Sequence, residues 1–164
     1  MDYLPQVETV IKKLLKSDRM VKGVVLSDRT GLSLMAIWRK TVKNMELEGT
    51  ASLASAMYAA GEKFGDGSLG ELDVIALDYM ENKVKIFLKG AGRAIIALVT
   101  GLQADTTSVK NALRNCSKEI APLMGSAVGL DVLGKHVELL VGEKGKKPSI
   151  ASKMADALKE LESF

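Results

Sequence analysis

The residues of this chain that could act as a nucleophile, a base or a metal ligand are few and far apart. Its only histidine, His136, stands in a glycine-flanked stretch without a second histidine or a cysteine at metal-site spacing. Its only cysteine, Cys116, falls on the apolar side of an expected helix, where a buried inert thiol is more usual than a nucleophile. A single cysteine excludes an intrachain disulfide and is typical of a reducing compartment. The pattern predicts no metal site and no catalytic residue.

Two glycine-containing stretches resemble nucleotide-binding loops but lack residues that such loops require. Gly90-Ala91-Gly92 precedes an expected strand rather than a helix, and a third glycine is missing. Gly145 and Lys146 would be half of a phosphate loop, but Leu140 occupies the first glycine position and Lys147 the position of the Mg²⁺-binding hydroxyl. No serine stands in the strand–turn–helix context of a hydrolase nucleophile. We therefore expect a protein that is not an enzyme and has no cofactor.

Composition and charge indicate the size of the domain and limit the binding partners and the location that we expect. The 164 residues are enough for one domain with a core that needs no disulfide or metal, and 47% apolar and 26% charged residues are ordinary values. A net charge of +3 from scattered cations, with 4% aromatic residues, argues against nucleic acid. The first ten residues do not read as a signal peptide, and no apolar run reaches the length of a membrane span. We expect a cytoplasmic protein without membrane insertion.

The expected helices and strands of the chain are arranged around a hairpin of two strands. Val24-Val25-Leu26 is nearly unbroken apolar sequence, which predicts a strand buried on both faces, and 32–37 supplies a second strand. Between them, Asp28 can bond to its own backbone and Gly31 can adopt a positive φ. An apolar helix from about residue 5 to 16 precedes the hairpin.

An alanine-rich helix over 50–64, with Thr50 as its N-cap, follows the hairpin. Leu53, Met57 and Phe64 make one apolar stripe, while alanines and serines keep much of the remaining surface small. Small side chains let a second backbone approach closely. That backbone belongs either to the protein's own sheet or to a helix of an oligomer partner, and the sequence leaves both alternatives open.

Three further strands are expected over 72–80, 83–89 and 94–99, followed by a helix from Thr107 or Ser108 to Pro122. The strand over 72–80 carries no lysine or proline that would protect a sheet edge, so it needs pairing or cover. Beyond Pro122 we expect a short strand over 137–141 and an amphipathic helix that begins at Ser149. The predicted domain is 1–122, and 123–164 is a C-terminal extension.

This order of elements, with the hairpin 23–32, the helix 51–64, the strands over 72–99 and the helix 107–120, resembles the Roadblock/LC7 family over residues 5 to about 122. The resemblance implies an α+β protein with the profilin-like fold of that family, an α/β/α sandwich. Its five-stranded antiparallel sheet would have the order 2-1-5-4-3. The middle helix would cover one face, and the first and last helices the other.

The resemblance also implies function. Members form homodimers or heterodimers that join their third strands edge to edge, and their partners are Ras-like small GTPases or dynein-type assemblies. In bacterial and archaeal relatives such as the MglB proteins, the dimer binds a GTPase and accelerates hydrolysis. Two alternatives remain: an assembly scaffold of the dynein light chain type that engages no GTPase, and a sensor that holds a small molecule under the middle helix.

Two residue sets follow as expectations. The dimer interface would use small residues of the middle helix and residues of the third strand: Ala56, Ala60, Leu72, Val74, Ala76 and Asp78. The GTPase would bind around the paired middle helices, near Ser52, Ser55, Tyr58, Ala59 and Glu62.

We do not expect this protein to supply a catalytic arginine to a GTPase. Such a residue must be exposed on a mobile loop that reaches the γ-phosphate. Of the five arginines, Arg29 alone stands at a turn tip. It is therefore the residue that could contradict this expectation.

Overall fold

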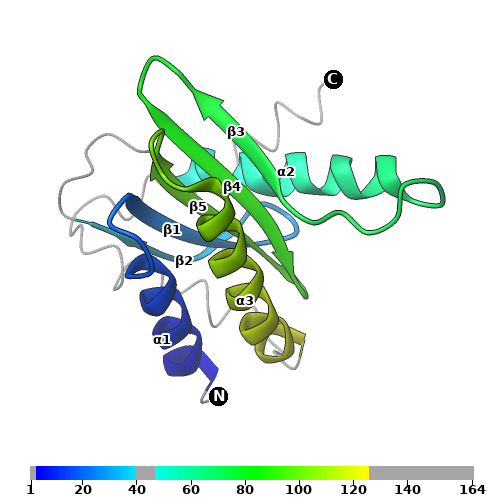
Figure 1. Cartoon of the computed structure of the whole chain (residues 1–164). Coiled ribbons are helices and arrows are strands. Elements are labelled where there is room, and N and C mark those ends of the chain that lie inside the picture. The colour runs from blue at the N-terminus through cyan, green and yellow to red at the C-terminus, as the bar shows by residue number, and fades with distance from the viewer. Residues whose placement is uncertain (1–2, 40–46, 126–164) are drawn as a thin grey trace.

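The computed structural model describes residues 3–39 and 47–125. In this part of the chain a five-stranded antiparallel sheet lies between helices, with the strand order β2-β1-β5-β4-β3 (Figure 1). The predicted sheet order is confirmed. The elements are α1 (Tyr3–Leu15), β1 (Val21–Asp28), β2 (Ser33–Trp38), α2 (Leu47–Gly65), β3 (Ile75–Tyr79), β4 (Val84–Ala91), β5 (Ala94–Gly101) and α3 (Thr106–Gly125).

Two apolar layers cover the two faces of the sheet. Alternate residues of each strand point to opposite faces, so Val25 packs under α2 whereas its neighbour Leu26 packs under α1 and α3. In Figure 1, α1 and α3 lie side by side on one face of the sheet. All eight residues of the central strand β5 are buried, as expected for a strand covered on both faces. The α/β/α sandwich that the resemblance implies is confirmed.

The turn between β1 and β2 is built as its sequence predicts. Gly31 has a φ of 96°, a left-handed conformation that favours glycine. The Oδ1 atom of Asp28 accepts hydrogen bonds from the backbone N–H groups of Thr30 at 2.8 Å and Leu32 at 3.0 Å. These bonds close the turn and set the pairing of the two strands.

Replacing Gly31 by valine should lower the free energy of unfolding by about 1–3 kcal/mol, because a β-branched residue is strained at positive φ. Urea denaturation of both proteins measures the difference. Gly31→Asn is the control, since asparagine tolerates this conformation better. Equal denaturation midpoints for wild type and Gly31→Val would show that the turn has a different backbone.

The starts of two helices differ from the sequence prediction. α2 begins at Leu47 rather than at Thr50, because Leu47 is buried in the core layer under α2 and extends the helix by one turn. The cap of α3 is Asp105, not Thr107 or Ser108. Its carboxylate accepts a 3.2 Å bond from the N–H of Thr107 and a 2.9 Å bond from the hydroxyl of Ser108.

The end of α3 also differs. The helix continues through Pro122 to Gly125, and Met124 in its last turn is fully buried in the core layer under α1 and α3. This packing outweighs the tendency of proline to end a helix. The expected strand over 137–141 and the helix from Ser149 lie outside the described residues. The division into 1–122 and 123–164 stays a prediction.

Candidate functional site

One side of α2 is apolar and exposed. Leu53, Met57, Ala60 and Phe64 recur at helical spacing on this side, and we call them the apolar stripe. Leu53 is half-buried against the core layer under α2, and the other three are exposed. The side chains of Met57 and Phe64 are 36% and 79% exposed. A large apolar side chain as exposed as Phe64 is unusual in a monomer when other exposed apolar residues adjoin it. The stripe is therefore a candidate contact surface.

The apolar stripe lies beside the chain that leads into β3. Gly61 stands on the helix between Met57 and Phe64, and a Cβ built on it would be 2.8 Å from Leu72 Cδ2 and 3.4 Å from Ile75 Cδ1. β3 pairs with β4 alone, so its other edge carries no strand in the described part of the chain. An unpaired strand edge next to exposed apolar side chains is a typical site of self-association.

The structure separates the residues expected at a dimer interface into two groups. Ala56 and Ala60 of α2, with Ala76 and Asp78 of β3, are exposed. Leu72 and Val74 precede β3, which begins only at Ile75, and they are half-buried. Leu72 packs on the α2 side of the sheet and Val74 on the opposite side. These two residues therefore contribute to the core of the protomer.

Met57 and Phe64 were missing from the expected interface. The helical period places them on a different side of α2 from Ala51, Ala54 and Tyr58, but only the structure shows that the side with these three residues is the buried one. Ala51 and Ala54 are the small residues that let α2 lie close to its own sheet. For these two alanines, the backbone that approaches closely is therefore that of the protein's own sheet and not that of an oligomer partner.

Tyr58 is part of the core rather than of an exposed docking surface, which corrects its expected position. Its side chain is 2% exposed, and its hydroxyl lies 2.9 Å from the carbonyl oxygens of both Leu72 and Asp73. Ser55 is also buried, and its hydroxyl donates a 3.2 Å hydrogen bond to the carbonyl of Ser52. The Tyr58 hydroxyl holds α2 to the segment before β3, whereas the Ser55 bond lies within α2, and neither buried side chain faces a partner.

Three residues of the expected GTPase-binding set remain accessible. Ala59 is exposed, and Ser52 and Glu62 are half-buried. Glu62 forms an ion pair with Arg29. Binding of a GTPase by these residues stays a prediction.

Arg29 is engaged on three sides. Besides its ion pair with Glu62 in α2, Nη2 donates a 3.0 Å hydrogen bond to the carbonyl of Gly92, in the turn between β4 and β5. Its guanidinium carbon lies 5.8 Å from the centre of the Tyr58 ring, within the range of a cation–π contact. The guanidinium is exposed but lies against the protein's own surface, and the expectation that Arg29 does not act on a GTPase stays a prediction.

Asp73 joins the segment before β3 to both α3 and β4. Its Oδ2 atom accepts bonds of 3.0 Å and 2.6 Å from Arg114, and its Oδ1 lies 3.2 Å from the Lys89 ammonium. The hydrogen bonds from Arg114, aided by Lys89, hold the pKa of Asp73 below its ordinary value. The ionised carboxylate is thus favoured in the folded protein.

The variant Asp73→Asn should lose stability at pH 7 but not at strongly acidic pH. Because the folded-state pKa is lowered, the stabilisation is present above the unfolded-state pKa of about 3.9 and disappears as pH falls through the folded-state value. The loss should be small, since both side chains are partly exposed. Urea midpoints at pH 7 and below pH 3 test this, with Asp66→Asn as control. A difference between wild type and Asp73→Asn that persists in acid would contradict it.

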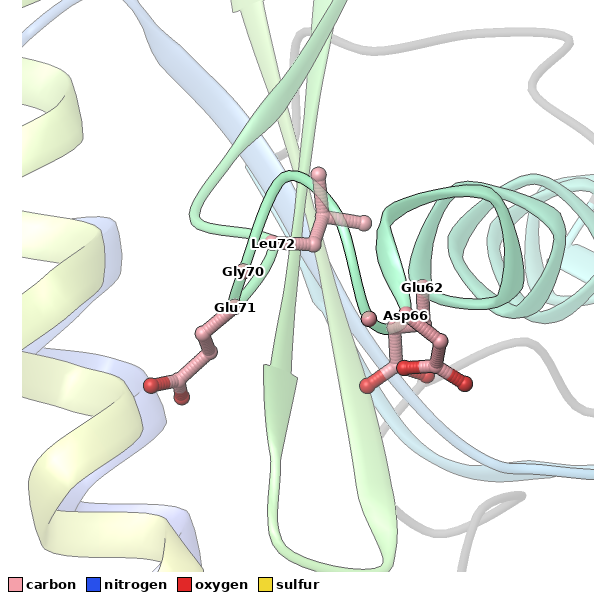
Figure 2. A pocket seen from close by; sticks show the side chains of 6 residues that line it. Glu62, Asp66, Gly70, Glu71 and Leu72 are labelled. Atoms are coloured by element: carbon pink, nitrogen blue, oxygen red, sulfur yellow. The ribbon is translucent and has the colours of Figure 1, made fainter.

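An open pocket of about 320 Å³ lies at the C-terminal end of α2. Glu62, Asp66, Gly67, Gly70, Glu71 and Leu72 line it. In Figure 2 the carboxylate of Glu71 points away from those of Glu62 and Asp66. Among residues 3–39 and 47–125, no group of three or more acidic, histidine or cysteine side chains could hold a metal ion. The pocket is not under the middle helix, where the sensor alternative would place a ligand.

The remaining residues considered as catalytic or metal-binding groups are either unreactive or lie outside the described residues. Cys116 is buried, and burial, followed by the charge of Glu119, raises the pKa of its thiol to about 12. The thiol therefore stays protonated at neutral pH and is a poor nucleophile. His136, Gly145 and Lys146 lie outside the described residues. No described helix combines the length and the apolar character that crossing a membrane requires.

Comparison with solved structures identifies the fold of this chain, whereas comparison of its sequence finds no match. No family model and no curated protein matches the sequence. Solved structures match it well, among them "MglB with tetrameric arrangement" (18% identity, TM-score 0.69), which covers 78% of this chain and 94% of that one. The gliding protein MglB from Thermus thermophilus has 18% identity and a TM-score of 0.68, covering 77% and 94%. A Roadblock/LC7 domain from Streptomyces avermitilis has 19% identity and a TM-score of 0.61, covering 71% and 95%. With its sheet order and helix layers, the chain therefore has the Roadblock/LC7 fold in its MglB-like form.

Proposed function

We propose that this chain is a dimeric regulator that binds a Ras-like small GTPase and is not itself an enzyme. The observation that carries the proposal is the apolar stripe of α2 next to the unpaired edge of β3. The similarity to MglB structures supports it, and one of these is described as having a tetrameric arrangement, which is a form of self-association. The reducing cytoplasm, where the buried Cys116 would stay a thiol, is part of the same proposal.

In the proposed dimer, two copies of β3 pair along their free edges and two copies of α2 pack against each other. The exposed residues Ala56 and Ala60 allow close approach of the helices, and Met57 and Phe64 supply the apolar area. Burying a large apolar side chain that is otherwise exposed contributes about 1.5–3 kcal/mol. Phe64 occurs twice in a symmetric interface, so its contribution counts twice.

The GTPase would bind across the outer surface of the paired α2 helices, which includes Ser52, Ala59 and Glu62. Regulation would come from a higher affinity for one nucleotide state of the GTPase, since a partner shifts an equilibrium only by binding two states differently. It would not come from an arginine in trans, because Arg29 is already held by Glu62 and Gly92.

Sedimentation of the full chain at micromolar concentration tests the dimer. Capture of a Ras-like GTPase encoded near this gene, loaded in turn with GDP and with a non-hydrolysable GTP analogue, tests the partner. We expect a dimer that retains the GTP form more strongly than the GDP form. A dimer that retains neither form would instead support the assembly scaffold of the dynein light chain type.

A further inference from the structure

We infer that Arg29 is a positioning residue, which holds the C-terminal half of α2 so that the apolar stripe is presented at a fixed angle to a second copy of the chain. The inference rests on the proposed dimer and adds to it the residue that controls its affinity. We call the contacts of Arg29 with Glu62, Gly92 and Tyr58 the Arg29 clamp.

The Arg29 clamp joins segments that are distant in sequence. Arg29 comes from the β1–β2 turn, Glu62 is 33 residues away in α2, and Gly92 is 63 residues away in the β4–β5 turn. Gly90 of β4 makes room for it, since a Cβ there would be 3.1 Å from Arg29 Nη2 and 2.7 Å from the Tyr58 ring. The Arg29 guanidinium and the Tyr58 ring therefore lie directly on the sheet. The ion pair with Arg29 connects Glu62 to this part of the sheet.

The C-terminal half of α2 has few other anchors. After Tyr58, only Gly65 of the remaining helical residues is buried, and the half-buried Gly61 leaves no room for a Cβ beside Leu72. Glu62 is therefore the polar side chain by which the last two turns are tied to the β1–β2 and β4–β5 turns.

The Arg29 clamp and the apolar stripe lie on opposite sides of α2. Met57 precedes Glu62 by five residues and Phe64 follows it by two. At about 100° per residue these offsets correspond to roughly 140° and 160° around the helix. Because the ion pair of Glu62 restrains rolling of the helix on one side, Met57 and Phe64 keep a narrower range of directions on the other side. Loss of the clamp would leave the stripe intact but variable in angle, which weakens a packed interface.

The test uses Arg29→Gln, Glu62→Gln and the double variant of the full chain. Each single variant should raise the dimer dissociation constant about threefold to fivefold, and the double variant no further, because both remove the Arg29–Glu62 ion pair. Lys13→Gln is the matched control. It breaks another exposed ion pair, between Lys13 of α1 and Glu119 of α3, on the opposite face of the sheet, and should leave the dimer constant unchanged.

Hydrogen exchange at the backbone amides of residues 62–66 provides a second measurement that does not need a dimer. Exchange should be faster in Arg29→Gln than in wild type or Lys13→Gln. Unchanged exchange, dimer constants within twofold of wild type, or additive effects in the double variant would each overturn the inference. A monomeric wild type whose exchange still responds to Arg29→Gln would refute the proposed dimer and the effect on its affinity, while retaining the anchoring of α2 by Arg29.

Discussion

Replacement of Tyr58 by alanine should lower the free energy of unfolding by about 3–5 kcal/mol, the usual cost of deleting a large buried aromatic ring. Tyr58 is among the largest fully buried side chains of the described residues, and its ring packs on Gly90. Its hydroxyl also bonds to the carbonyls of Leu72 and Asp73, so deletion of the side chain leaves polar groups without their partner.

Urea denaturation of Tyr58→Ala measures this loss, with Tyr58→Phe as the matched control. The phenylalanine variant keeps the ring and loses the hydroxyl, so it should cost only about 1 kcal/mol. If Tyr58→Ala unfolds at the same urea concentration as wild type, Tyr58 lies outside the core. A loss of partner binding in Tyr58→Ala would not identify a docking surface, because the variant is expected to be destabilised throughout.

Phe64→Asp should raise the dimer dissociation constant at least about a hundredfold, while the stability of the isolated protomer stays unchanged. A symmetric interface would bury two aspartates without partners, and burial of an unpaired charge is strongly unfavourable. In the protomer the Phe64 side chain is 79% exposed, and substitutions at such surface positions usually change stability by less than about 0.5 kcal/mol.

Sedimentation velocity at several concentrations measures the dissociation constant. Leu69→Asp is the control, since Leu69 is similarly exposed but follows α2 in the loop and is not part of the apolar stripe. Ala76→Pro tests the other half of the interface, because proline within β3 disturbs strand pairing. A wild type that is monomeric at micromolar concentration, or a Phe64→Asp protein that dimerises like wild type, would contradict the proposed interface.

The sequence by itself determined most of the strands, helices and turns, because the signals that specify them are local, whereas the strand order was implied by the resemblance to the Roadblock/LC7 family. Unbroken apolar runs marked strands such as β5, which is buried along its whole length. The turn at Asp28 and Gly31 was predicted from the side-chain and backbone chemistry of those two residues, and both act there as expected. A strand and its turn depend on residues that are adjacent in the chain, so their pattern can be recognised without tertiary contacts.

Only the tertiary structure decided how α2 is rotated about its own axis. Two sides of this helix have a regular helical pattern, one with Ala51, Ala54 and Tyr58 and the other with Leu53, Met57 and Phe64. The first side packs on the sheet because small residues allow close approach and the Tyr58 hydroxyl finds carbonyl partners in the segment before β3. Apolar periodicity alone would have chosen the more hydrophobic second side.

The partners of Arg29 were likewise beyond prediction from local pattern. An arginine at a turn tip reads as solvent-exposed and mobile, whereas its ion pair and hydrogen bond reach residues 33 and 63 positions away. Contacts over such distances exist only once the sheet has brought the β1–β2 turn, the β4–β5 turn and α2 together. A single sequence specifies which elements form, but the contacts between their side chains depend on the angles at which those elements pack.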